Sequence, residues 1–210
     1  MTQKILPSIM AKSQKELDGD LKKLKGIVKT VHLDVVDGKF APNKTFQFPF
    51  KLKKGFDYNV HLMIKNPEKW INKNGKKVDT ILFHPEVVEK EKIESLINKI
   101  KSMKKKAGFA LKPETKVKTI KSFLDKLDYV LILTVHPGFY GSRFLKSKLR
   151  KIKQVKRLNK KVKVIVDGGM CPNVIGKAAK AGADFFVSGS YTTKADNPKQ
   201  SIKNLMKAIK

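Results

Sequence analysis

Apolar and polar residues alternate along this chain in blocks that repeat eight times. Short runs of apolar and β-branched residues are separated by longer stretches whose apolar positions recur every three or four residues, as on one face of a helix. The short runs predict strands over 4–10, 31–36, 58–64, 80–85, 107–112, 129–135, 162–169 and 185–190. The longer stretches predict helices over 13–25, 49–54, 67–74, 90–105, 116–126, 146–159, 173–181 and 197–209.

Eight strand–helix pairs predict a parallel sheet, because the helix after each strand carries the chain back across the sheet. Eight such pairs also close into a (β/α)8 TIM barrel, and no linker-like segment divides the chain. We therefore expect a single α/β domain, a (β/α)8 barrel over 1–210. An open, doubly wound sheet is the alternative, and it fits less well because no glycine-rich dinucleotide-binding loop follows the first strand.

The stretch "VHLDVVDG", which begins at Val31, places a histidine and a carboxylate inside a hydrophobic strand. Successive side chains of a strand point to opposite faces, so His32 and Asp34 share one face while Val31, Leu33 and Val35 share the other. The wholly apolar face must pack against helices. His32 and Asp34 are therefore predicted to point into the barrel.

The same alternation applies to His61 in "YNVHLMI" and to Asp167 in "VIVDGG", which shares a face with Ile165. Two ionised carboxylates that meet in a cavity of low dielectric repel each other strongly unless a cation lies between them. Two imidazoles and two carboxylates suit Zn²⁺, Fe²⁺, Mn²⁺ or Co²⁺, and the donor set alone does not choose among these ions. Buried polar residues that only satisfy one another's hydrogen bonds are the alternative. The predicted metal ligands are His32, Asp34, His61 and Asp167.

All four histidines of the chain fall at or near the carboxyl ends of predicted strands. They are His32, His61, His84 and His136. A barrel of this kind builds its active site at that end of its strands. Four histidines on one face therefore favour a functional site over isolated core residues.

Small residues follow the last three predicted strands, in the segments "HPGFYGS", "DGG" and "SGS". Glycine lets backbone N–H groups approach an anion closely, and a helix N-terminus adds a favourable potential. The loops after the seventh and eighth strands are also a common phosphate position in this fold. Together the three loops predict a ligand that carries a phosphate group.

Composition narrows the class of protein. The chain has 47 Lys and Arg against 18 Asp and Glu, a formal charge of +29 at pH 7, so it attracts anions. The lysines are scattered along the whole length, and no RNA-binding signature accompanies them, so no specific nucleic-acid partner is expected. Cys171 is the one cysteine, so the chain has no internal disulfide. No run of apolar residues approaches membrane-spanning length. We expect a cytoplasmic protein with no membrane partner.

These motifs together resemble the ribulose-phosphate 3-epimerase family over essentially the whole chain. "LPSIM", "HLDVVDGKFAPN", "HLM", "TVHPGFYG", "VDGG" and "SGS" are similar to the motifs of its successive strands. The resemblance implies a ribulose-phosphate-binding barrel and an epimerase with no organic cofactor that binds one divalent metal ion. It also implies a homo-oligomer, whose subunit number the sequence does not specify.

The resemblance assigns roles to individual residues. Asp34 and Asp167 would be the acid/base pair that interconverts D-ribulose 5-phosphate and D-xylulose 5-phosphate at C3 through a metal-stabilised enediolate. The metal would be held by His32, Asp34, His61 and Asp167. Substrate would be bound by Ser8, His61, Gly138, Phe139, Tyr140, Gly141, Gly168, Gly169, Gly189 and Ser190.

The chain departs from the family pattern at a few positions. Val36 and Leu133 stand where the family usually has methionine, and "GFYGS" replaces the usual Gly-Phe-Gly-Gly-Gln phosphate loop. "FHPE", from Phe83, also resembles D-allulose-6-phosphate 3-epimerases, so a six-carbon ketose phosphate is the alternative substrate. Decarboxylase and synthase relatives carry a lysine at the position of Val36, which argues against them. A basic barrel that binds nucleic acid is a third, less favoured interpretation.

Overall fold

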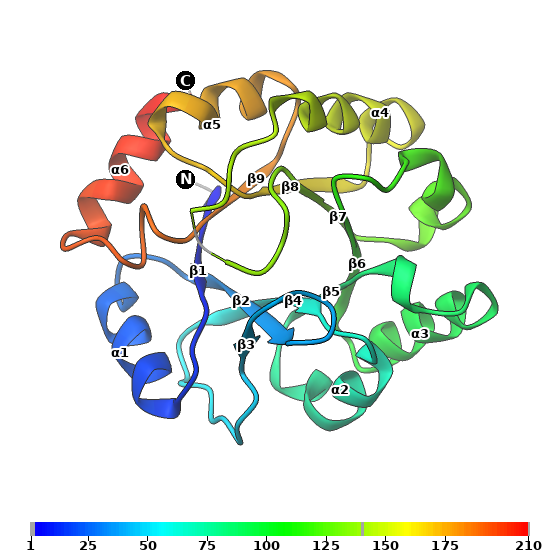
Figure 1. Cartoon of the computed structure of the whole chain (residues 1–210), viewed down its shortest axis with the longest axis horizontal. Helices are drawn as coiled ribbons and strands as arrows, with labels where there is room; N and C mark the ends of the chain where they lie inside the picture. The colour runs from blue at the N-terminus through cyan, green and yellow to red at the C-terminus, as the bar shows by residue number, and fades with distance from the viewer. Residues whose placement is uncertain (1–2, 140, 210) are drawn as a thin grey trace.

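In the computed structural model, which describes residues 3–139 and 141–209, eight parallel strands form a closed barrel (Figure 1). Their order in the sheet is β1-β9-β8-β7-β6-β5-β4-β2, and β1 closes the barrel by pairing with β2. The predicted TIM barrel is therefore confirmed. The strands are β1 (Ile5–Ile9), β2 (Thr30–Asp37), β4 (Asp57–Met63), β5 (Thr80–Phe83), β6 (Lys106–Leu111), β7 (Tyr129–Leu133), β8 (Lys163–Asp167) and β9 (Phe185–Ser188).

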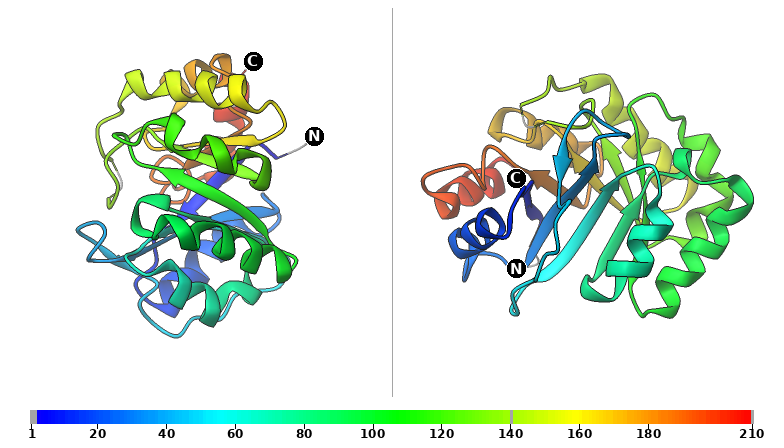
Figure 2. Two further views of the ribbon diagram at one scale, coloured as in Figure 1. Left: turned by 90° about the vertical axis from the view of Figure 1, so that its right-hand side faces the viewer. Right: turned by 60° about the horizontal axis from the view of Figure 1, so that its bottom comes forward.

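Helices surround the barrel, and their first residues explain where several of them begin (Figures 1 and 2). The Ser13 side chain accepts a hydrogen bond from the backbone N–H of Glu16, and Asn66 and Asn197 cap two other helices whose first residue is proline. The α-helices are α1 (Gln14–Leu24), α2 (Pro67–Asn74), α3 (Lys90–Ser102), α4 (Arg150–Leu158), α5 (Pro172–Lys180) and α6 (Pro198–Ala208). The 3-10 helices are η1 (Gly75–Lys77), η2 (Pro85–Val87), η3 (Val117–Lys126) and η4 (Lys146–Leu149).

The segment after β2 differs from the prediction. The short helix expected over 49–54 does not form, and a two-residue strand, β3 (Lys44–Thr45), pairs antiparallel with the end of β2 instead. The rings of Phe46, Phe48 and Phe50 contact one another, and the Phe50 ring stacks on Trp70. Burial of these rings therefore fixes this connection without a helix.

Two apolar layers lie on either side of the barrel wall. Val31, Leu33 and Val35 belong to the large core between the strands and the helices. A smaller cluster fills the inside of the barrel and includes Leu6, Leu82, Ala110, Leu131, Leu133, Ile165 and Val187. The predicted alternation in β2 is thus confirmed, because the apolar face of the strand packs outward and leaves His32 and Asp34 for the interior.

Among the residues that the structure describes, no helix combines the length and the apolar character that crossing a bilayer requires.

The barrel wall leaves no room for a side chain at Gly108 in β6. A Cβ there would lie 2.6 Å from Leu82 Cδ2 and 2.7 Å from the carbonyl oxygen of Tyr129. We expect Gly108→Ala to lower the free energy of unfolding by about 1–3 kcal/mol through overpacking. Gly19 in α1 has no neighbouring atom within 4 Å of the same Cβ position. Gly19→Ala is therefore the matched control, with an expected gain of about 0.5–1 kcal/mol. Urea unfolding of both variants measures the two changes, and an unaffected Gly108→Ala would contradict this packing.

Candidate active site

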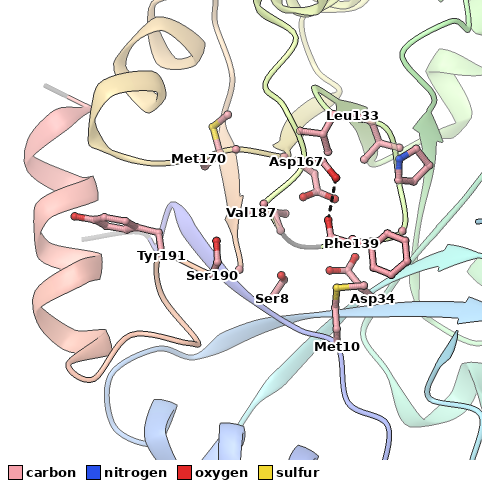
Figure 3. A pocket seen from close by; sticks show the side chains of 18 of the residues that line it. Ser8, Met10, Asp34, Leu133, Phe139, Asp167, Met170, Val187, Ser190 and Tyr191 are labelled. Atoms are coloured by element: carbon pink, nitrogen blue, oxygen red, sulfur yellow. Dashed lines mark hydrogen bonds between the residues drawn. The ribbon is translucent and has the colours of Figure 1, made fainter. Parts of the chain in front are cut away.

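A cavity of about 410 Å³ opens at the carboxyl ends of the strands. The loops after β7, β8 and β9 form much of its wall, and Ser8 and Met10 line it from the first strand and the loop after it (Figure 3). Asn43 donates a hydrogen bond from Nδ2 to the carbonyl oxygen of Gly138 at 2.7 Å, which ties the loop after β7 to the loop after β2. The cavity therefore lies where this fold places its active sites.

Four polar side chains converge beneath this cavity. His32, Asp34, His61 and Asp167 each offer one ligand atom, and these atoms all lie within 4.8 Å of one another. Asp34 Oδ1 is 3.3 Å from both His32 Nε2 and His61 Nδ1, and Asp167 Oδ2 is 3.5 Å from His61 Nδ1. The structure thus brings together all four residues that the strand pattern selected.

Strand register explains why these residues meet. Asp34 in β2 pairs with His61 in β4, and His32 pairs with Asn59 in the same ladder. Asp167 is the last residue of β8 and reaches the cluster from the other side of β1 and β9. Parallel neighbours in register direct residues of the same parity to the same face, so one inward-facing residue on β2 determines its partner on β4.

The His32 ring has one nitrogen with a partner and one without. Its Nδ1 lies 2.7 Å from Oδ1 of Asn59, a carbonyl oxygen that can only accept, so Nδ1 carries the proton. Nε2 therefore keeps its lone pair, which faces Asp34 and has no hydrogen-bond partner among the described residues. A buried imidazole lone pair directed at a carboxylate is unfavourable, and a cation between the two groups would satisfy both.

His61 is held in a similar way by a second histidine. His61 Nε2 lies 2.9 Å from Nε2 of His84, and His84 Nδ1 lies 3.4 Å from Oε2 of Glu86. A proton on His84 Nδ1, facing the carboxylate, leaves His84 Nε2 to accept from His61 Nε2–H. When the His61 ring is neutral, as metal binding would require, its Nδ1 presents a lone pair to the cluster.

The ionisation of the cluster follows from burial and pairing. Burial alone would raise the pKa of Asp34, but the neighbouring imidazoles of His32 and His61 outweigh it and hold that pKa well below its usual range. Burial alone would lower the pKa of His61, but hydrogen bonds to Asp167 and Asp34 raise it to about 9. Burial lowers the pKa of His84 to about 4, so His84 stays neutral at pH 7. Without a metal ion, His61 is therefore the cation that the two aspartates share.

The predicted substrate-binding residues surround the mouth of the cavity, apart from His61 and Tyr140. His61 is fully buried and meets the two aspartates below the cavity, whereas Tyr140 lies outside the described residues. The cavity wall includes Ser8, Gly138, Phe139, Gly141, Gly168, Gly169, Gly189 and Ser190.

Gly168 and Gly169 adopt backbone conformations that favour glycine, with φ angles of 111° and 68°. A Cβ at Gly168 would lie 2.5 Å from Cγ2 of Val135, which shows how closely the loops after β7 and β8 pack. The two glycines leave the wall of the cavity formed largely by backbone. Such a wall can present N–H groups to an anion.

One of the four histidines does not join the cluster. His136 lies on the loop after β7, but its side chain is 70% exposed and pairs with Glu114 at 3.5 Å. The expectation that all four histidines converge on one site is therefore wrong for His136. This residue comes after the end of β7, so no pairing with a neighbouring strand fixes the direction of its side chain. Asn59 and Glu86 were missed by the sequence pattern. Asn59 could have been found, since it lies two residues before His61 and shares its face.

Comparison with known proteins agrees with this geometry. A family model described as "Ribulose-phosphate 3 epimerase family" matches residues 4–193. The chain belongs to the ribulose-phosphate 3-epimerase family. It is 34% identical to the ribulose-phosphate 3-epimerase of Bacillus subtilis, over 96% of this chain and 97% of that protein. It is 35% identical to the enzyme of that name from Escherichia coli K12, over 89% of this chain and 87% of that protein.

Solved structures support the fold assignment. Orotidine 5'-monophosphate decarboxylase from Sulfolobus solfataricus superposes with a TM-score of 0.69, at 16% identity, over 99% of this chain and 98% of that chain. A mutant tryptophan synthase alpha-subunit from Pyrococcus furiosus superposes with a TM-score of 0.70, at 15% identity, over 98% of this chain and 97% of that chain. At this identity, the likeness concerns the barrel alone.

Two of the positions at which this epimerase-family chain departs from the family pattern, Val36 and Leu133, are still apolar and buried. Leu133 lines the cavity, and Val36 packs with Met63 and Ala41 beside it. Met10 and Met170 also line the cavity (Figure 3). Methionine side chains are therefore present in the wall although two usual positions lack them.

The raised pKa of His61 makes the stability of chelator-treated protein depend on pH. The pKa rises from 6.5 in the unfolded chain to about 9 in the folded one. The stabilisation that protonated His61 gives to the folded state is therefore complete below pH 6.5 and is lost as pH rises through 9. We expect a loss of about 3 kcal/mol in the free energy of unfolding across this window. Urea unfolding of the wild type and of His61→Asn at several pH values measures the difference, and identical pH dependence in both would contradict the pairing.

Proposed function

We propose that this protein interconverts D-ribulose 5-phosphate and D-xylulose 5-phosphate by inverting the configuration at C3. The observation that carries this proposal is the meeting of two carboxylates from β2 and β8 in one cavity that glycine-rich loops surround. Inversion by proton transfer requires an acid and a base on opposite faces of the reacting carbon. Family membership supplies the substrate class.

Asp34 and Asp167 are suited to be that acid and base. Both line the cavity, and they approach it from strands separated by β1 and β9 (Figure 3). One carboxylate takes the C3 proton, and the other, protonated, gives its proton to the opposite face of C3. The two groups begin a turnover in opposite protonation states and end it with those states exchanged. His61, within 3.5 Å of both carboxylates, keeps them in place.

A divalent metal ion fits the residues present. His32 Nε2 is buried without a partner among the described residues, and two carboxylate oxygens lie close to it. His32, Asp34, His61 and Asp167 would hold the ion, with Asn59 and His84 fixing the two imidazoles. When bound, the ion supplies stabilisation of the negative charge that develops on the sugar oxygens after C3 loses its proton.

The remaining residues of the cavity would bind the ends of the sugar. We assign the phosphate to the loops after β7, β8 and β9, whose members are Gly138, Gly141, Gly168, Gly169, Gly189 and Ser190. Ser8 lies beside the aspartates and would hydrogen-bond the sugar (Figure 3). Met10, Met63 and Leu133 provide an apolar wall, which lowers the local dielectric and strengthens the electrostatic interactions with the reacting centre.

Replacement of either aspartate tests the acid/base pair. Asp34→Asn and Asp167→Asn are each expected to lower kcat for epimerisation by at least about 10³-fold, because each removes one proton-transfer group. The assay follows product formation and deuterium uptake at C3 in D₂O, with D-ribulose 5-phosphate and D-allulose 6-phosphate as separate substrates. Asp196→Asn, the same change at an exposed aspartate outside the cavity, is the control and should keep most of the activity. Full turnover in either aspartate variant would remove that residue from the mechanism, and preference for the six-carbon sugar would replace the proposed substrate.

The contact between His84 and His61 predicts an effect on metal affinity. His84→Leu removes the acceptor for His61 Nε2–H, and we expect the affinity for Co²⁺ or Zn²⁺ to fall about 10- to 100-fold. Glu86→Gln, which leaves the His84 ring in place, should produce a smaller loss in the same direction. His136→Leu is the matched control, since His136 is exposed and outside the cluster. Titration of chelator-treated protein with the metal gives the affinities, and equal values in all variants would contradict the role of His84.

A further inference from the structure

A second hollow lies outside the barrel, between the loop after β6, η3 and α4. These elements are neighbours on the side of the barrel that faces the viewer in the left view of Figure 2. The volume of this hollow is about 730 Å³. Seven of its lining residues are cationic and one, Glu114, is acidic. The cationic residues are Lys116, Lys118, Lys121, Lys148, Arg150, Lys151 and Arg157.

Two other hollows of the surface contain carboxylates as well as lysines. The hollow beside α2 and α3 holds lysines too, but there Glu68 pairs with Lys99 and Glu89 pairs with Lys92. The hollow at the opposite end of the barrel mixes lysines with Asp125 and Asp128. Within the described part of the chain, none of the seven cations around the outer hollow forms an ion pair, and Glu114 pairs with His136. The hollow therefore carries uncompensated positive charge.

Burial of Lys151 makes the positive charge of the hollow unfavourable for the stability of the folded protein. Its side chain is buried, with 6% of the residue exposed, and Nζ donates a hydrogen bond to the carbonyl oxygen of Lys112 at 2.7 Å. Burial, followed by the neighbouring charge of Lys148, lowers the pKa of Lys151 to about 8, although the charges of Glu114 and Glu86 act in the opposite direction. A buried ammonium group with cationic neighbours is stabilised by an anion that enters the hollow.

We propose that this outer hollow binds a small molecule that carries two or more linked phosphate groups. A single phosphate offers at most two negative charges to seven cations, whereas a chain of phosphates offers several and can reach residues of both η3 and η4. The volume of 730 Å³ is that of a pocket for a small organic ligand. Leu158, one of two large apolar side chains that stand exposed on the described residues, lies at the edge and provides a contact for an uncharged part of such a ligand.

The test compares two triple variants that carry the same change in net charge. Lys118→Gln, Lys121→Gln and Lys148→Gln together remove cations from both sides of the hollow. Lys22→Gln, Lys73→Gln and Lys203→Gln together remove exposed lysines from three other helices. Tripolyphosphate, orthophosphate and a short single-stranded RNA are titrated into each protein by calorimetry. The metal-ligating cluster is unchanged in all of them, so any removal of bound metal by tripolyphosphate contributes equally.

We expect the wild type to bind tripolyphosphate at one site and roughly tenfold or more tightly than orthophosphate, since the attraction grows with the charge of the ligand. The triple variant at the hollow should lose at least about tenfold in affinity for tripolyphosphate, and the control triple less than about twofold. Equal losses in the two triples would overturn the proposal in favour of a general charge effect. Tighter binding of RNA than of tripolyphosphate, with a loss confined to the triple at the hollow, would replace it with a nucleic-acid surface.

Discussion

The contact on which the site depends is the approach of two carboxylates to one buried imidazole. Asp34 and Asp167 both lie within 3.5 Å of His61 Nδ1, in a region from which most solvent is excluded. Burying charge in this way is unfavourable unless the charges are paired and hydrogen-bonded. The remaining contacts answer that requirement, since Asn59 fixes His32 and His84 fixes His61. Two ring nitrogens of this group, His32 Nε2 and His84 Nδ1, have no hydrogen-bond partner among the described residues.

Closure of the barrel is what makes such a set possible. Residues from β2, β4 and β8 meet because each strand directs every second side chain inward and the ladder aligns neighbours in register. The inner apolar cluster below them fills the barrel, so the polar groups lie on a packed floor. The apolar residues that stabilise the barrel therefore lie deeper in its interior, and the functional residues lie nearer the carboxyl ends of the strands.

Period-two alternation explains how much could be predicted. It selected His32, Asp34, His61 and Asp167 because an inward polar residue in an apolar strand stands out. The alternation could not place His136, whose direction depends on a loop and on Glu114. It also could not show that the side chain of Glu86, in η2, reaches His84. The helix expected at 49–54 is absent for a similar reason. Phe46, Phe48 and Phe50 recur at every second residue, but the contacts among their rings and between Phe50 and Trp70 are tertiary. Contacts between strands were predictable, whereas contacts that loops create were not.

The net charge of +29 also becomes interpretable only in three dimensions. In the sequence the lysines look evenly scattered, which favours a general solvated surface. In the fold, many of them pair with carboxylates on neighbouring elements, as Lys156 and Lys163 do with Asp184. Unpaired cations gather around the outer hollow, whose lining holds seven cationic residues and one carboxylate, Glu114. Uneven pairing, rather than the number of lysines, therefore decides where on this surface an anion would be attracted most strongly.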